Sequence, residues 1–460
     1  MSDPIGLETS TRTEIEFDPA ARESRPRPFL FLVLEADRPL AGGARYCLDD
    51  IEEVAVGRGP ERTATRTSVE GRNRLDIRAS GPFLSKDHGT FRRDGDGWAV
   101  QDLGSRNGVM VNGTPIEAPT KLAPGDIVAL GRLFFVFQIE TAEQLPDVDA
   151  EDITRAPPGL LTLLAPLQQR MKRLRQEAGR RTAVTLIGET GTGKEVTAKA
   201  IHEISGRRGP YVGINCGAIP RDLIQSELFG YVKGAFSGAT DNRGGYVREA
   251  HQGTLLLDEV VAAPEQVQVA LLRVIQEQAV TPLGGRQPQP VDVRFVAAAQ
   301  KPLADAVGEG KFREDLQARL EAFRFELPPL RERMEDLGIF IAAELKKMGV
   351  TAKDKPRLSS PVVMRLLGYD WPKNIRELAQ TINVAWGGAR DGEIGESEDL
   401  PKPKDENANP TARLKQQLIA HMRATQGNIA EVGRRMNRPR STIHFFLERF
   451  GLDAKSFRDG

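Results

Sequence analysis

The chain has 460 residues, 64 basic and 64 acidic side chains, and two cysteines, Cys47 and Cys216. The length suits about three domains of ~150 residues, and the balanced charge singles out no class of partner. The cysteines are too far apart for a metal or redox motif, no apolar run approaches the ~18 residues of a membrane helix, and the polar N-terminus lacks a signal-peptide core, so we expect a cytoplasmic protein.

The N-terminal part predicts a tail followed by a β-sandwich. Residues 1–28 are polar and rich in Pro, Ser and Thr, which is typical of disorder. Between residues 29 and 140, short apolar runs, beginning with Phe29–Leu34, alternate with turn signals such as Asn112-Gly113. Many short strands with regular turns favour an all-β sandwich. The segment Gly59–Asn73 is expected to lengthen a loop.

Donors for a phosphate group occur in the loops of this sandwich. A dianionic phosphate is held by guanidinium, ammonium and hydroxyl groups, and Arg58, Ser85 and Lys86 would supply them. The region resembles the forkhead-associated (FHA) domain, a phosphothreonine reader, at Gly57, Arg58, Ser85, His88 and Asn107. The resemblance implies that Asn107 holds the ligand backbone and that His88 braces the loops.

The sequence leaves the ligand of this domain open. It would be a phosphothreonine protein, a Ser/Thr kinase, or another subunit, since the tail carries Thr9, Thr11 and Thr13. A sandwich that serves only packing or dimerisation is the alternative.

Residues 141–158, with three prolines and five acids, predict a linker. From Gly159 an amphipathic helix is expected, and the apolar run Ala183–Ile187 then predicts a buried strand. A glycine-rich loop with a lysine follows, directly before a helix. This order indicates a phosphate-binding loop, whose N–H groups and helix N-terminus hold a polyphosphate; a glycine-rich turn with a chance lysine is the alternative. The loop consists of Gly188, Glu189, Thr190, Gly191, Thr192, Gly193, Lys194 and Glu195.

A second apolar run, from Thr254, ends in Asp258 and Glu259. Acids at the end of a strand beside a phosphate loop can bind a metal ion and activate water. We therefore expect a bound polyphosphate, with Lys194 on its β- and γ-phosphates, and a metal ion beside these acids. A strand that merely ends in surface acids is the alternative.

Motifs from residue 159 to 390 resemble bacterial sigma-54-dependent activators, the AAA+ ATPases known as enhancer-binding proteins. They are the phosphate loop, Glu227–Gly230, Gly234–Ala239, Asp258-Glu259, Phe312–Leu316, Leu327–Arg333 and Trp371–Leu378. The resemblance implies an α/β ATPase core at 159–329 and an α-helical lid at 330–390.

The resemblance also assigns catalytic roles. Asp258 would organise magnesium, Glu259 would polarise the attacking water, and Asn215 would restrain Glu259 until the partner is engaged. Arg313 and Arg319 resemble arginine fingers that act on a neighbouring subunit's nucleotide, which implies a homo-oligomeric ring, by resemblance a hexamer.

Two further roles follow from the same family. Arg376 resembles the second sensor of the nucleotide. The loop that contacts sigma-54 would be Gly234, Ala235, Phe236, Ser237, Gly238 and Ala239, with Phe236 in contact. Three positions depart from the usual pattern: Ser237 replaces threonine, Gln300 replaces asparagine in the first sensor, and Lys373 replaces glycine.

Residues 391–411 are acidic and predict a second linker. Residues 412–460 hold ten Lys/Arg against four Asp/Glu and resemble an all-α, Fis-type helix-turn-helix that binds DNA. One helical face carries Ile429, Val432 and Met436, and another carries Ile443, Phe446, Leu447 and Phe450. The expected DNA contacts are Arg440, Ser441, Thr442 and His444. A helical dimerisation tail is the alternative.

Together these features predict a multidomain transcription activator that senses phosphorylation and binds upstream promoter DNA. It would use ATP to remodel sigma-54 RNA polymerase holoenzyme, without a membrane. The rival hypothesis is a phosphorylation-dependent adaptor whose nucleotide module is an assembly switch that does not act on sigma-54.

Overall fold

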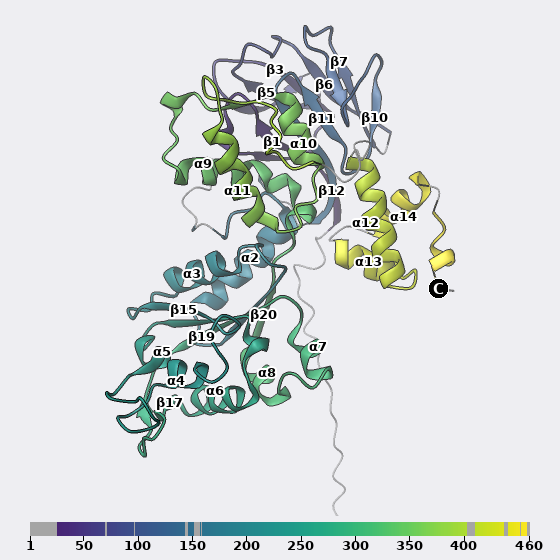
Figure 1. Cartoon of the computed structure of the whole chain (residues 1–460). Helices are drawn as coiled ribbons and strands as arrows, with labels where there is room; N and C mark the ends of the chain where they lie inside the picture. Colours follow the sequence, from purple (N-terminus) through teal and green to yellow (C-terminus); the bar gives the residue numbers. More distant parts are fainter. Residues whose placement is uncertain are drawn as a thin grey trace, which may run out of the picture.

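The computed structural model describes residues 25–69, 71–95, 97–142, 146–150, 157, 159–402, 410–436, 440–450 and 452–457. Most of the predicted tail, with Thr9, Thr11 and Thr13, and part of both predicted linkers lie outside these residues. In Figure 1 the β-sandwich and the lid helices lie above the parallel-sheet core, with three C-terminal helices to one side. Both cysteines are free and buried.

The predicted β-sandwich is confirmed. Its two sheets have the strand orders β13-β2-β1-β12-β11-β8-β9 and β10-β7-β6-β3-β5-β4. The strands are β1 (Arg25–Glu35), β2 (Ala44–Cys47), β3 (Glu53–Arg58), β4 (Thr63–Val69), β5 (Arg72–Ala79), β6 (Gly89–Asp94), β7 (Gly97–Asp102), β8 (Val109–Val111), β9 (Thr114–Pro115), β10 (Thr120–Leu122), β11 (Ile127–Leu130), β12 (Leu133–Ala142) and β13 (Val148–Asp149).

The expectation of a long loop at Gly59–Asn73 is wrong. Much of this segment forms β4, an edge strand that pairs antiparallel with β5 from Thr63↔Arg78 to Val69↔Arg72. Alternating threonines suit a strand, and two arginines fix its position. Arg62 forms ion pairs with Glu35 and Asp149, and Arg66 forms one with Asp147 at 2.7 Å.

The predicted ATPase core is a parallel sheet of order β15-β16-β19-β14-β20 with helices around it. Its elements are α2 (Ala165–Ala178), β14 (Val184–Ile187), α3 (Lys194–Ser205), β15 (Tyr211–Asn215), α4 (Ile224–Phe229), α5 (Gly245–Glu249), β16 (Thr254–Asp258), α6 (Glu265–Glu277), β17 (Ala279–Val280), β18 (Gln289–Pro290), β19 (Arg294–Ala299), α7 (Leu303–Gly308), α8 (Glu314–Leu320) and β20 (Phe323–Glu326). The helix expected from Gly159 begins only at Ala165, because Asp336 holds the preceding segment through Thr162 Oγ1 (2.8 Å) and Leu163 N (2.6 Å).

The lid contains α9 (Leu337–Lys347), α10 (Ser360–Gly368), α11 (Asn374–Gly387) and a small parallel pair, β21 (Arg357–Leu358) and β22 (Glu393–Ile394). Short 3₁₀ turns occur at Pro39–Ala41, Val260–Ala262, Leu330–Glu332, Met334–Asp336, Ala352–Asp354 and Ala454–Phe457.

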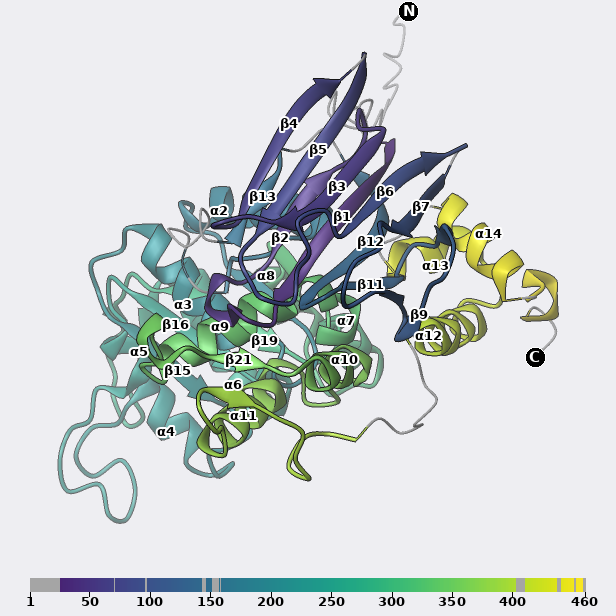
Figure 2. The ribbon, with the colours of Figure 1, turned by 90° about the horizontal axis from the view of Figure 1, so that it is seen from above.

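One apolar core joins the sandwich to the lid. Figures 1 and 2 show from two directions that the lid helices lie beside the sandwich. Strand β1 is buried on both faces: Leu30 and Leu32 point into the sandwich, whereas Phe29, Phe31 and Val33 pack with lid residues such as Leu337, Ile341 and Trp371. Strands buried on both faces read as continuous apolar runs. The run Phe29–Leu34 is therefore apolar throughout because one face of the strand packs in the sandwich and the other packs on the lid.

Polar contacts fix the same interface. Gln138 on β12 donates to Glu335 (2.5 Å), and Arg132 forms an ion pair with Glu393 on β22 (2.9 Å). The backbones also approach closely, because a Cβ on Gly338 of α9 would lie 1.9 Å from the Val33 carbonyl oxygen.

The C-terminal helices are α12 (Pro410–Ala424), α13 (Ile429–Met436) and α14 (Arg440–Arg449). The two predicted faces meet in a small core of Leu418, Met422, Val432, Met436, Ile443, Phe446 and Leu447. Residues 437–439 and Gly451 lie outside the described residues. In the described part of the chain, no helix has both the length and the apolar character that crossing a bilayer requires.

Candidate functional site

A cavity of about 510 Å³ lies between the phosphate loop and the lid. The core contributes residues from the loop and from the carboxyl ends of β15, β16 and β19, where a parallel sheet places its ligand sites. The lid contributes α9 and α11. The lining residues are Thr190, Gly191, Gly193, Lys194, Glu195, Val196, Asn215, Asp258, Glu259, Ala299, Gln300, Glu344, Lys347, Ile375, Arg376, Ala379, Gln380 and Asn383.

The loop has the shape of a phosphate cradle. Gly191 (φ 79°) and Gly193 (φ 102°) adopt positive φ, which glycine allows without steric cost. Lys194 begins α3, and its ammonium group donates to the carbonyl oxygens of Gly188 (2.7 Å) and Glu189 (3.0 Å). The pKa of Lys194 lies below its usual value, because burial lowers it more than the neighbouring Asp258 and Glu259 carboxylates raise it.

The acid pair faces the lysine at the end of β16. Asp258 pairs in register with Asn215 of β15, and its carboxylate accepts the Glu259 N–H at 3.0 Å. Mg²⁺ prefers oxygen ligands and is usually held by one or two carboxylates together with phosphates. The donor set therefore fits a nucleotide-bound magnesium ion, with Asp258 as the protein ligand.

Asn215 and Glu259 lie side by side. The Asn215 side-chain oxygen accepts the N–H groups of Gly217 (2.8 Å) and Ala218 (3.1 Å). A Cβ on Gly217 would lie 2.4 Å from Glu259 Oε2 and 3.3 Å from Asn215 Oδ1. Between these two described side chains there is no direct hydrogen bond, so the restraint of Glu259 by Asn215 stays a prediction.

The lid side of the cavity contains the predicted second sensor, Arg376, two residues into α11. Gln300, which replaces the asparagine usual in the first sensor, is exposed and lines the same cavity. The structure adds contacts that the sequence reading missed: Arg331 and Asn374 both bond to Glu189 of the phosphate loop. Both occur in motifs noted above, but only the fold brings them to the loop.

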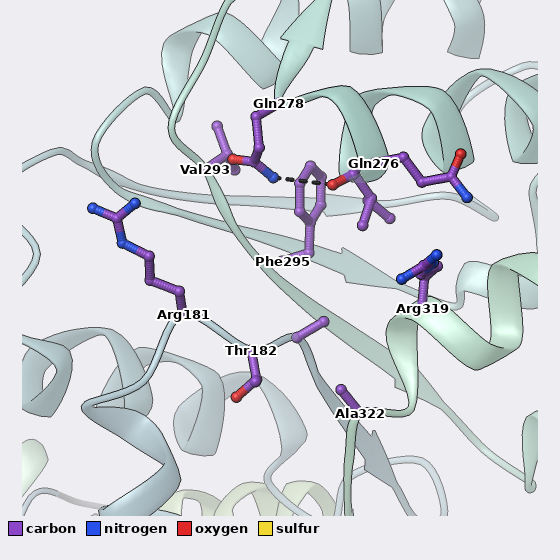
Figure 3. Close-up of a pocket in the computed structure, with 10 residues that line it drawn as sticks. Arg181, Thr182, Gln276, Gln278, Val293, Phe295, Arg319 and Ala322 are labelled. Atoms are coloured by element: carbon purple, nitrogen blue, oxygen red, sulfur yellow. Dashed lines mark hydrogen bonds between the residues drawn. The ribbon is translucent and has the colours of Figure 1, made fainter.

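The predicted arginine fingers are absent from the described lining of this cavity. Arg313 precedes α8 and is held by Asp315 (2.7 Å). Arg319 lines a second recess of about 390 Å³ together with Arg181, Thr182, Gln276, Gln278 and Phe295 (Figure 3). This recess lies near the starts of β14, β19 and β20, so it is at the opposite edge of the parallel sheet from the phosphate loop.

The predicted sigma-54 loop projects from the core between α4 and α5. Its glycines at 234 (φ 81°) and 238 (φ 108°) adopt positive φ, and Gly234 N donates to Ala239 O at 2.9 Å. The Phe236 ring is 43% exposed and contacts Tyr231 edge to face, with ring centroids 5.0 Å apart. Ser237 is also exposed.

A second loop supports this one. Tyr231 forms a parallel bridge with Leu283, Val232 N donates to Leu283 O (3.0 Å), and a Cβ on Gly284 would lie 2.9 Å from Ala235 Cβ. The sequence reading did not include residues 283–285 in the site.

The predicted phosphothreonine site lies at one end of the sandwich. Arg58, Lys86 and Asn107 are exposed and Ser85 is partly buried. Their loops are tied together: the buried His88 ring accepts Ser85 N (3.1 Å) and contacts Gly108 O (3.0 Å), and Asn107 Nδ2 donates to Phe83 O (2.7 Å). Four donor-bearing side chains are thus held on fixed loops.

In the C-terminal helices, Arg440 and His444 are exposed on α14. Ser441 and Thr442 belong to the same helix, but their side chains lie outside the described part.

The parallel core, phosphate loop, acid pair and helical lid define an AAA+ ATPase. Comparison with known families gives the same division: residues 162–326 match the sigma-54 interaction domain, 331–417 the AAA+ ATPase lid domain and 55–131 the FHA domain. The chain belongs to the family of sigma-54-dependent transcriptional regulators, and it carries an FHA domain.

Several relatives support this assignment. The chain is 42% identical over 253 residues to the sigma-54-dependent transcriptional regulator SfnR of Pseudomonas fluorescens. The aligned region covers 52% of this chain and 68% of SfnR. It is 41% identical over 309 residues to the acetoin dehydrogenase operon transcriptional activator AcoR of Bacillus subtilis (63% of this chain, 50% of AcoR). It is 39% identical over 298 residues to the C4-dicarboxylate transport transcriptional regulatory protein DctD of Pseudomonas aeruginosa (61% of this chain, 63% of DctD). The chain thus spans half to two thirds of the length of AcoR and DctD.

Among solved structures, NtrX from Brucella abortus in complex with ATP aligns with a TM-score of 0.47 and 29% identity, over 66% of this chain and 71% of NtrX.

Proposed function

We propose that the chain is a sigma-54-dependent transcription activator that hydrolyses ATP in the loop–lid cavity to remodel the closed complex of sigma-54 RNA polymerase. The observation that carries this proposal is the exposed Phe236 loop on a core that also holds the phosphate loop and the acid pair. A remodelling ATPase needs both a nucleotide site and a surface that delivers the work, and one core supplies the two.

The residues have distinct roles in this proposal. Lys194 and the loop N–H groups bind the phosphates, and Glu259 orients and polarises the attacking water. A magnesium ion held by Asp258 would neutralise charge on the transferring phosphoryl group. Gln300 and Arg376 face the nucleotide from the core and the lid.

Arg313 and Arg319 act on the nucleotide of a neighbouring subunit. Their position outside the chain's own cavity supports action in trans, which requires a ring of copies. An arginine finger is worth on the order of 10³-fold or more in rate.

The FHA domain senses a phosphothreonine partner through Arg58, Ser85, Lys86 and Asn107, and the C-terminal helices bind upstream promoter DNA as a helix-turn-helix. The position of these four side chains on loops that are hydrogen-bonded to one another supports the first role. The excess of basic over acidic residues in the C-terminal segment and the exposure of Arg440 support the DNA-binding role.

The test is promoter opening by the full-length chain with sigma-54 holoenzyme on a sigma-54 promoter. We expect ATP-dependent opening that Phe236→Ala abolishes while ATP turnover persists, and that Glu259→Gln abolishes together with turnover. Turnover without any opening, in a wild-type protein that forms rings, would instead support the adaptor hypothesis, which the departures from the family pattern at Ser237 and Gln300 keep open.

A further inference from the structure

The phosphate loop is fastened to the lid by an ion pair. Both oxygens of the Glu189 carboxylate accept bonds from the Arg331 guanidinium, Oε2 from Nη1 at 2.8 Å and Oε1 from Nη2 at 2.5 Å. This bidentate geometry is the strong form of an arginine–carboxylate contact. Arg331 lies in the segment that joins the core to the lid, so the pair links the phosphate loop to the start of the lid.

Asn374 adds a second fastening. Its side chain is fully buried and uses both polar atoms: Oδ1 accepts Leu330 N at 2.7 Å, and Nδ2 donates to Glu189 Oε2 (3.1 Å) and Thr190 O (3.0 Å). Its φ of 55° lies in the left-handed region, which asparagine tolerates better than most residues. Asn374 is the first residue of α11, so it sets where that helix begins.

The loop backbone touches the same point. A Cβ on Gly191 would lie 2.1 Å from the Lys373 carbonyl oxygen and 3.0 Å from Arg376 Cβ. Only a residue without a side chain permits this approach. The position of Arg376 relative to the phosphates is therefore defined by contacts between the loop and the start of α11.

Fold stability alone does not account for the ion pair. Its side chains are 28% and 41% exposed, and pairs at such sites contribute little to stability. The charges matter more for the nucleotide. Glu189 is an anion inside a loop built to hold anions, and Arg331 lowers its pKa, so it stays ionised. Arg331 offsets the repulsion that this carboxylate would exert on bound phosphates.

We propose that Glu189, Arg331 and Asn374 are positioning residues for ATP hydrolysis. Arg331 neutralises Glu189 and ties the loop to the lid, while Asn374 places α11 so that Arg376 faces the phosphates. The inference rests on the proposed ATPase function and deepens it. It names three residues that hold the lid side of the cavity in position without contacting the reacting atoms.

The experiment compares Arg331→Gln, the double variant Glu189→Gln/Arg331→Gln, and Asn374→Ala in the full-length chain. The readouts are affinity for a fluorescent ATP analogue, KM and kcat for ATP, and Tm. Arg180→Gln is the control, because it removes an exposed ion pair with Glu177 (2.8 Å) on the same core.

We expect Arg331→Gln to weaken ATP binding and raise KM by on the order of tenfold, with little change in Tm. The double variant should recover most of the affinity because it removes the uncompensated charge. Asn374→Ala should lower kcat more than it raises KM, because Arg376 loses its position.

Equal affinities for the wild type, Arg331→Gln and the double variant would overturn the inference, as would a double variant no better than Arg331→Gln. Absence of turnover in the wild type would overturn the proposed ATPase function instead. The binding arm would still decide whether Glu189 and Arg331 act on the nucleotide.

Discussion

Substitution of Gly338 by alanine distinguishes a lid that is packed on the sandwich from one that is free of it. In an isolated helix, Gly→Ala stabilises by up to about 1 kcal/mol, because alanine has the higher helix propensity. In this structure the added methyl would lie 1.9 Å from the Val33 carbonyl oxygen. Since close carbon–oxygen contacts are about 3.3 Å or longer, helix α9 and strand β1 would have to separate by more than 1 Å.

Overpacking of this kind costs about 1–3 kcal/mol, so Gly338→Ala should lower the stability of the folded protein rather than raise it. We expect Gly338→Ala to unfold at lower temperature than the wild type. The matched control is Gly387→Ala in α11 of the same lid, where a Cβ would meet nothing within 4 Å; this variant should be neutral or slightly stabilised.

The assay is thermal unfolding of the full-length variants, followed by circular dichroism and calorimetry. A Gly338→Ala protein as stable as the control variant would refute the shared core and would mean that sandwich and lid separate in solution.

Three other predictions concern separate parts of the chain. Arg58→Ala should weaken binding of a phosphothreonine peptide by about tenfold or more, measured by calorimetry, and an unphosphorylated peptide should bind neither protein. Arg440→Ala should weaken DNA binding similarly for all sequences and reduce the salt dependence of binding by about one ion; unchanged, salt-insensitive binding would remove the DNA role of α14. Burial lowers the pKa of His202, whose ring contacts Thr254 Oγ1 at 3.0 Å. Because the unfolded chain binds the proton more readily, stability should fall as pH drops below about 6.5, and a His202→Gln variant should lose less Tm over that range.

The sequence predicted the local elements that bear strong patterns. The glycine loop before α3 and the apolar strands before Asp258 and Lys194 are short-range signals, and each appears in the structure where expected. The faces of α13 and α14 were also predicted, because the 3.6-residue period of a helix is visible in the spacing of Val432 and Met436.

Contacts between distant segments were not predicted. Strand β4 was missed because it consists largely of threonines and small residues, with Val69 as its one large apolar residue, and its Arg66 pairs with an acid far away in sequence, Asp147. The link between Glu189 and Asn374 joins residues 185 positions apart. The apolar run of β1 indicated a strand, but nothing in it showed that one of its faces belongs to the lid.

The core that β1 and β12 share with the lid helices has a consequence for how the molecule comes apart. Family boundaries divide the chain at residues 131, 162, 326 and 331, yet residues that pack together unfold together. The sandwich and the lid are therefore expected to unfold as one cooperative unit, although the family boundaries separate them. A fragment cut at residue 159 would expose the apolar side of α9 and α11 to water, and its failure to work would report a broken folding unit rather than the loss of a regulator.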